Sequence, residues 1–122
     1  MKTILVAVAV FLLSACGTGP LIKSSEESDK AKGIRLAIRE NVRLIQACYE
    51  AELKQDAGFS GELTMEWDID DKGVASNVNR KSGSIIKESM VRCVAKQIEG
   101  IEFSPSEPGN VTTVSYPFKF LQ

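Results

Sequence analysis

Residues Gly61–Ile69 read Gly-Glu-Leu-Thr-Met-Glu-Trp-Asp-Ile, and this stretch decides the fold. Its leucine, methionine, tryptophan and isoleucine alternate strictly with acidic residues and threonine, the pattern of a β-strand with one buried and one solvated face. The next residues, Asp70–Gly73 (DDKG), predict a tight turn in which Gly73 can take a positive φ. A weaker strand with Val74 and Val78 on one face follows, so an antiparallel hairpin is expected.

Helical periodicity is found on both sides of this hairpin. Before it, a helix is predicted from Lys30 to Ala57, capped by Ser28 or Asp29. After the turn Arg80–Gly83, a second helix is predicted from about Ser84 to Glu99. Each helix has one apolar stripe, formed by Ile34, Ile38, Val42, Ile45, Tyr49 and Leu53 in the first, and by Ile86, Met90, Cys93, Val94 and Ile98 in the second.

The last predicted strand, Val111–Leu121, follows a proline-containing loop at Phe103–Gly109. Pro117 cannot donate to a strand ladder, so it must lie on an open sheet edge or at a bulge. The predicted order is helix, strand, strand, helix, strand. The expected fold class is α+β, a two-layer αββαβ arrangement in which two helices cover one face of a three-stranded antiparallel sheet. The face of the last strand expected to pack inward carries Val114, Tyr116, Phe118 and Phe120.

The composition excludes several functions. The chain has 122 residues, 15 Lys and Arg against 16 Asp and Glu, no histidine and three cysteines. This length supports one domain with a modest core. The balanced charge gives no basic footprint for nucleic acid. The missing histidine removes the commonest general base and metal ligand, and an odd cysteine count in an exported protein needs an explanation.

The N-terminus has the pattern of an export signal. The uncharged apolar run Ile4–Leu13 follows Lys2, and its ten residues would span only about half of a bilayer as a helix. Leu13–Cys16 (LSAC) resembles the bacterial lipobox, so residues 1–15 are predicted to be a lipoprotein signal peptide and Cys16 the lipidated residue. The alternative is an ordinary signal peptide with an incidental cysteine. Residues 16–29 are expected to form a flexible tether, residues 30–122 the periplasmic domain, and Gly17 points to the outer membrane.

The remaining cysteines, Cys48 and Cys93, lie on the two helical stripes. The alternatives are a redox pair, a soft metal site or two buried free thiols. Because an exported domain meets an oxidising compartment, a structural disulfide between the helices is the favoured interpretation. No CxxC motif and no histidine supports catalytic redox chemistry or zinc binding.

A set of short motifs follows the predicted elements along the chain: Ile45–Glu50 (IQACYE), Gly61–Leu63 (GEL), Asp71–Val74 (DKGV), Cys93-Val94, Phe103–Pro105 (FSP) and Tyr116–Phe120 (YPFKF). The series is similar to the AgmX/PglI C-terminal domain, a branch of the TonB and TolA C-terminal superfamily, over roughly residues 34–121. The resemblance implies a small periplasmic module that binds proteins and is not an enzyme. Energy transduction is not implied, because a transducer needs a permanent membrane helix and a long proline-rich spacer.

Acidic residues around the hairpin suggest two other functions, a calcium site and a pair of catalytic carboxylates, and neither is favoured. Residues 68–73 faintly resemble a calcium loop, but Lys72 stands where an acidic or amide ligand is needed and Asn79 where a glutamate is needed. Glu62, Glu66 and Asp68 could be read as catalytic carboxylates, yet alternating acids usually form the solvated face of a strand. No nucleophile–base pair, phosphate loop or cofactor motif is present, so the sequence predicts neither an enzyme nor a cofactor.

The sequence therefore predicts a lipid-anchored periplasmic protein that binds envelope proteins in an assembly such as motility or transport machinery. Its partner-binding residues are expected on the edge strand, at Val114, Tyr116, Pro117, Phe118 and Phe120, where a partner strand could pair. Pro117 could equally blunt the edge against pairing. The alternatives are a purely structural envelope lipoprotein and a disulfide-handling enzyme. No nucleic acid or small-molecule substrate is expected.

Overall fold

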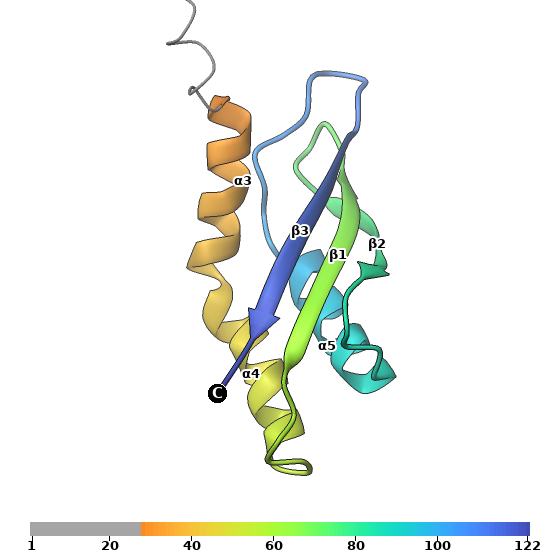
Figure 1. The fold of residues 1–122 in the computed structure, drawn as a ribbon. Helices are drawn as coiled ribbons and strands as arrows, with labels where there is room; N and C mark the ends of the chain where they lie inside the picture. The colour runs from red at the N-terminus through yellow and green to blue at the C-terminus, as the bar shows by residue number, and fades with distance from the viewer. Residues whose placement is uncertain (1–27) are drawn as a thin grey trace, which may run out of the picture.

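The computed structural model describes residues 28–122. The predicted signal peptide, the lipidated Cys16 and most of the tether lie outside the described residues. The described chain folds as helices and strands in the order helix, helix, strand, strand, helix, strand (Figure 1). The elements are α3 (Asp29–Glu40), α4 (Val42–Leu53), β1 (Gly61–Ile69), β2 (Ala75–Ser82), α5 (Glu88–Glu99) and β3 (Thr112–Phe120).

The three strands form one antiparallel sheet in the order β2-β1-β3. Strand β1, the stretch with strict alternation, lies in the centre, and β2 and β3 are the two edges. The predicted α+β class and the three-stranded antiparallel sheet are confirmed. The last strand is an edge, as Pro117 indicated.

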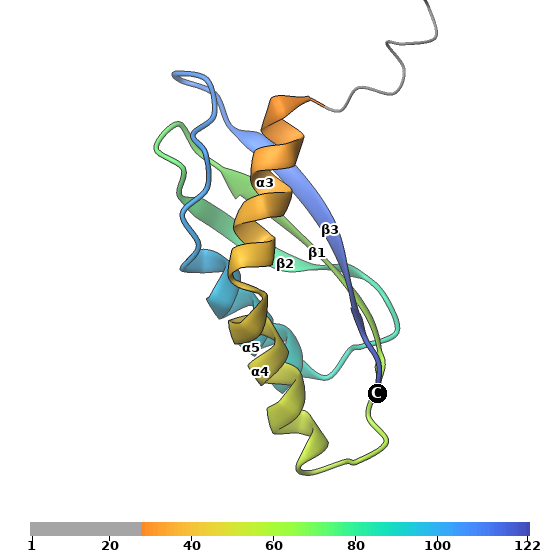
Figure 2. The ribbon, with the colours of Figure 1, turned by 90° about the vertical axis from the view of Figure 1, so that its left-hand side faces the viewer.

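The helices cover one face of the sheet, which Figure 2 shows with the helices in front. The inward side chains of β1 are at most 1 % exposed, and they pack against apolar residues of α3, α4 and α5. Tyr49 of α4 packs on Phe120 with 5.3 Å between ring centroids, and its hydroxyl donates to the Phe59 carbonyl over 2.7 Å. This core lies between Ile34 and Phe120 and gives the described segment a hydrophobic centre of its own.

The predicted first helix is broken into two. Asn41 has φ −109° and ψ 9°, and its side-chain amide donates to the Ala37 carbonyl over 2.8 Å. A short polar side chain that bonds to the preceding turn competes with helical pairing. The break changes the direction of the chain, so Val42 is 46 % exposed instead of lying on the predicted apolar stripe. The N-cap prediction holds, because Ser28 Oγ accepts from the Ala31 N–H over 3.1 Å.

The second helix begins later than predicted, at Glu88. Ser84 is not its cap, because Ser84 Oγ accepts from the Glu62 N–H and the Ile85 N–H donates to the Glu62 carbonyl. These bonds hold residues 84–85 beside β1 in a non-helical conformation. As a result Ile85 is buried, whereas Ile86, which the helical pattern placed in the core, is 74 % exposed.

The second strand also differs in its limits. It extends to Ser82, through residues that were predicted to form a turn. Val74 is 51 % exposed and lies in the hairpin turn, while the neighbouring Ala75 takes the buried position. The expected positive φ at Gly73 is present, at 83°.

The loop between α5 and β3 packs on the hairpin tip. Phe103 is buried, and its N–H donates to the Gly73 carbonyl over 3.1 Å. Ser106 is 5 % exposed, and its hydroxyl donates to the Ile69 carbonyl over 2.7 Å. Within residues 28–122, no helix is both long enough and apolar enough to cross a membrane.

Candidate functional site

Strand β3 forms a regular open edge. Its register with β1 runs through nine consecutive pairs, from Gly61–Phe120 to Ile69–Thr112, without a shift. Pro117 pairs opposite Thr64 inside this ladder. A proline nitrogen cannot donate, so in an unbroken ladder it faces away from the partner strand. Because backbone groups alternate in direction along a strand, Thr113 and Ser115 then share the outward direction of Pro117.

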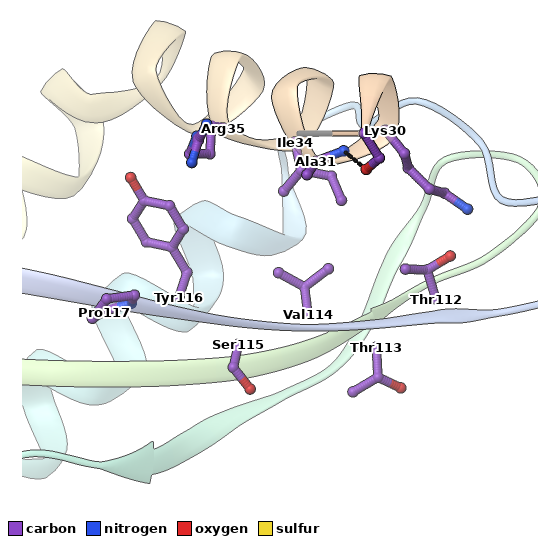
Figure 3. A pocket seen from close by; sticks show the side chains of 11 residues that line it. Lys30, Ala31, Ile34, Arg35, Thr112, Thr113, Val114, Ser115, Tyr116 and Pro117 are labelled. Atoms are coloured by element: carbon purple, nitrogen blue, oxygen red, sulfur yellow. Dashed lines mark hydrogen bonds between the residues drawn. The ribbon is translucent and has the colours of Figure 1, made fainter. Parts of the chain in front are cut away.

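A groove of about 640 Å³ lies between this edge and helix α3 (Figure 3). Val114 and Tyr116 point from β3 toward the helix, and Ala31 and Ile34 meet them from α3, whereas Thr113 and Ser115 point to the opposite side of the sheet. Val114 and Tyr116 are half-buried and lie against the core without being closed inside it. The groove therefore offers apolar contacts beside an edge with free backbone groups.

The charged side chains that line the groove are all cationic. Lys30 and Arg35 of α3 line it, and none of the described residues that line it is acidic. Arg35 and Tyr116 point toward one another across the groove in Figure 3. Cationic side chains beside an apolar floor favour a ligand that combines apolar and acidic residues.

The opposite edge, β2, is irregular. Its register with β1 shifts twice, between Thr64 and Met65 and between Glu66 and Asp68. Asn77 in this strand has φ 51°, a left-handed conformation uncommon for a residue other than glycine. Irregularities of this kind bend a strand and interrupt edge pairing. Of the two edges, β2 is thus the less suited to accept another strand.

The sheet face away from the helices carries the predicted row of acids. The pKa of Asp68 is lowered because its carboxylate accepts hydrogen bonds from Asn77 and Thr113, at 2.9 and 2.8 Å. Glu66 lies 3.6 Å from the Lys81 ammonium. These acids bond to neighbouring strands in the manner of a solvated sheet face. Among the described residues, no group of three potential metal-ligating side chains comes together.

A disulfide and a cluster of polar contacts join helix α4 to helix α5 and the residues just before it. Cys48 of α4 and Cys93 of α5 form a disulfide with 5.8 Å between Cα atoms, so the predicted pairing is confirmed. Beside it, the buried Glu52 carboxylate accepts from the Ser89 hydroxyl over 2.7 Å and lies 2.6 Å from the Lys87 ammonium. The hydrogen bonds from Lys87 and then Ser89 lower the pKa of Glu52.

Three of the predicted partner-binding residues line the groove, and two do not. Val114, Tyr116 and Pro117 lie together at the open edge. Phe118 and Phe120 are only 7 % and 3 % exposed, so their side chains belong to the core and are not available to a partner. They are buried because the C-terminal part of β3, which ends at Phe120, packs against Tyr49 of α4. The N-terminal part of β3, beside α3, stays partly open.

Sequence reasoning missed the helical wall of the groove. Ala31 and Ile34 were assigned to a helix and Ile34 to its core stripe, but nothing in the linear pattern places them opposite β3. That position depends on the angle at which α3 crosses the sheet, which the break at Asn41 helps to set.

Comparison with known proteins gives one structural likeness. No family model matches the chain, and no curated protein matches it. The solution NMR structure of the Pseudomonas aeruginosa TonB C-terminal domain is similar at 16 % identity and a TM-score of 0.45, covering 58 % of this chain and 74 % of that chain. A likeness at this level establishes neither a family nor an activity for this protein, and the resemblance to the AgmX/PglI domain stays a prediction.

Proposed function

We propose that this protein is a non-enzymatic component of a bacterial cell-envelope assembly that binds a partner protein along the edge of β3. The observation that carries the proposal is the regular β3 edge beside the apolar groove under α3. An extended segment added to β3 would gain main-chain hydrogen bonds, and alternate side chains would enter the groove against Val114 and Tyr116. Lys30 and Arg35 favour a segment that also carries acidic residues.

The proposed location rests on the N-terminal sequence. The apolar run before Leu13–Cys16 supports export followed by lipidation of Cys16, and Gly17 supports an outer-membrane address facing the periplasm. The disulfide between Cys48 and Cys93 agrees with an oxidising compartment. Two or more acyl chains on Cys16 would anchor the domain stably.

A purely structural role is the second candidate, and Pro117 favours it. Its missing N–H removes one outward donor from the β3 edge, which is a known way to discourage pairing. A structural lipoprotein would use its helices or its open sheet face for contacts and leave the edge unpaired.

Site-specific photo-crosslinking in cells tests the proposal. A photoreactive residue at Ser115 reports on the β3 edge, and the same residue at Asn79 reports on the β2 edge; both positions are exposed. We expect a discrete crosslinked partner from position 115 that is absent from position 79, and expect it to disappear with Val114→Glu. Equal crosslinking from both positions, or crosslinks from the helix surfaces alone, would contradict binding at β3.

A further inference from the structure

The outward surface of α3 and the start of α4 carries a basic ridge that the groove does not use. The ridge consists of Lys32, Leu36, Arg39 and Arg43, at steps of four, three and four residues. The spacing places Lys32, Leu36 and Arg39 along one side of α3, and Arg43 follows in the first turn of α4, beyond the break at Asn41. All four are exposed, and Lys32, Leu36 and Arg39 line one shallow hollow on the surface of α3.

The cations of the ridge form no ion pair with an acid of the described chain. Lys32, Arg39 and Arg43 have no ion pair within residues 28–122, whereas Glu52, Glu66 and Glu88 each lie beside a cation. Three of the four ridge residues are cationic, on a protein whose formal net charge is −1. The positive charge of this surface is therefore local and does not follow from the overall composition.

Large apolar side chains stand among these cations. Leu36 is 52 % exposed, and Leu44 and Val42 at the start of α4 are 53 % and 46 % exposed. Leu36 lies with Lys32 and Arg39 at the hollow, and Val42 and Leu44 flank Arg43 in the sequence. Exposed apolar residues interspersed with cations are typical of helices that lie in a membrane interface. The apolar groups enter the head-group layer while the cations contact anionic phosphates.

We propose that the basic ridge docks on the anionic surface of a phospholipid bilayer. Charge complementarity selects this occupant, and the position of α3 in the chain agrees with it. Helix α3 begins at Asp29, thirteen residues after Cys16, and an extended chain of this length reaches at most roughly 45 Å. This second argument rests on the lipid anchor of the proposed function, whereas the charge argument does not.

Docking would fix the orientation of the domain on the membrane. A lipid tether alone lets a domain rotate, but a second contact along α3 removes much of that freedom. Arg35 lies next to the ridge and also lines the groove at β3. The docked helix would therefore hold the β3 edge close beside the bilayer surface.

A tryptophan reporter in the full chain tests this proposal. Leu36→Trp places an exposed indole on the ridge, and the fully buried Trp67 supplies a constant background that the parent chain measures. The protein is mixed with vesicles of phosphatidylethanolamine and phosphatidylglycerol at 3:1, or of phosphatidylcholine alone, and brominated lipids serve as quenchers. Flotation of the parent chain at high salt, where the ridge contact is released, reports separately whether the chain is anchored to the vesicles.

We expect a blue shift and quenching of the ridge indole only in the anionic vesicles, and reversal at high salt. Replacing Lys32, Arg39 and Arg43 together with glutamine should weaken docking by about a hundredfold. The matched control removes three exposed cations elsewhere, with Lys54→Gln, Lys96→Gln and Lys119→Gln, and should preserve the signal.

Three outcomes overturn the proposal. One is an emission from the ridge indole that matches an exposed Asn79→Trp reporter on the β2 edge in anionic vesicles. Another is an equal response in phosphatidylcholine, which would show an apolar contact without charge selection. The third is protection of the ridge indole by a protein fraction and not by lipid, which would assign the ridge to an acidic protein partner. If the parent chain does not float at high salt but the ridge indole still responds at low salt, the anchor fails and the docking stands.

Discussion

Strands β2 and β3 both form edges of the same sheet, but β2 pairs with β1 through two register shifts whereas β3 pairs through nine consecutive residues. The β2 edge contains Asn77 with a positive φ, and the β3 edge borders an apolar groove under α3. Long, regular edges invite pairing, and bulges discourage it. The contrast indicates that β3 is the edge suited to a partner and that β2 is protected.

The largest expected effect comes from removing the disulfide between helices α4 and α5, which pack beneath the sheet. Replacing Cys48 and Cys93 together with alanine removes a link that closes a 45-residue separation. The chain-entropy model gives a loss of about 4 kcal/mol, or roughly 15–30 °C in Tm for a domain of this size. Differential scanning calorimetry measures the change.

Cys16→Ser is the matched control for this variant, because Cys16 lies outside the folded domain in the predicted organisation; its Tm should be unchanged. A decrease in Tm of less than a few degrees in the double variant would mean that packing alone holds α4 and α5 together.

A second substitution targets the hairpin that connects β1 to the irregular edge. A Cβ at Gly73, where φ is 83°, would lie 2.2 Å from the Phe103 carbonyl oxygen. Gly73→Ala therefore combines backbone strain with a clash and should cost about 2–3 kcal/mol. Gly109→Ala has a similar φ of 78° with no atom within 4 Å, so it should cost only about 1 kcal/mol. Equal losses in urea unfolding would show that the contact with Phe103 does not matter.

A matched pair of substitutions compares the two edges directly. Val114 in β3 and Val78 in β2 are both half-buried, so each tolerates a new charge to a similar degree. Val114→Glu should weaken partner binding at least about tenfold, because it replaces an apolar contact on the groove floor with a carboxylate that competes with an acidic partner for Lys30 and Arg35. Val78→Glu should leave binding unchanged. Titration by calorimetry with the crosslinked partner measures both, and equal losses would remove the distinction between the edges.

Acid should weaken the polar link between the supporting helices. The Glu52 pKa is lowered in the folded protein, so its stabilisation is fully present above the ordinary value near 4.5 and is lost as the pH falls through the lowered value. Glu52→Gln should cost about 1 kcal/mol at pH 7 and less at pH 3, and should flatten the acid dependence of Tm. Glu88→Gln, which breaks an exposed pair with Arg92, is the control and should change little.

The smallest effect on stability is expected at Pro117. Pro117→Ala restores an outward N–H on an exposed edge and should change the free energy of unfolding by less than about 0.5 kcal/mol. Its consequence should be seen in association. If Pro117 blunts the edge, the variant will self-associate in analytical ultracentrifugation at concentrations where the parent chain is monomeric. If Pro117→Ala binds the partner more tightly but stays monomeric, other features already protect the β3 edge from self-association.

The sequence predicts the sheet well because its signals are local. Alternation in Gly61–Ile69 and the turn residues before Gly73 specify the central strand and its hairpin whatever surrounds them. Pro117 identifies an edge for a similarly local reason, since the missing N–H excludes a central position.

The predictions that fail depend on distant contacts. The helical stripe placed Ile86 in the core, but Ser84 and Ile85 pair with Glu62 and delay the helix to Glu88. Phe118 was expected at the partner surface because alternation cannot tell which half of β3 is covered by α4. The groove itself was not predicted, because its second wall belongs to α3, more than seventy residues earlier in the sequence.

The central claim is that a partner strand pairs with β3 and not with β2. The most direct measurement is an amide chemical-shift titration of the folded protein with a synthetic peptide taken from the segment crosslinked at Ser115. We expect shifts and slowed exchange at the outward amides of β3, above all Thr113 and Ser115, with β2 unchanged. Shifts confined to β2, to the open sheet face or to the exposed helix surfaces would contradict it.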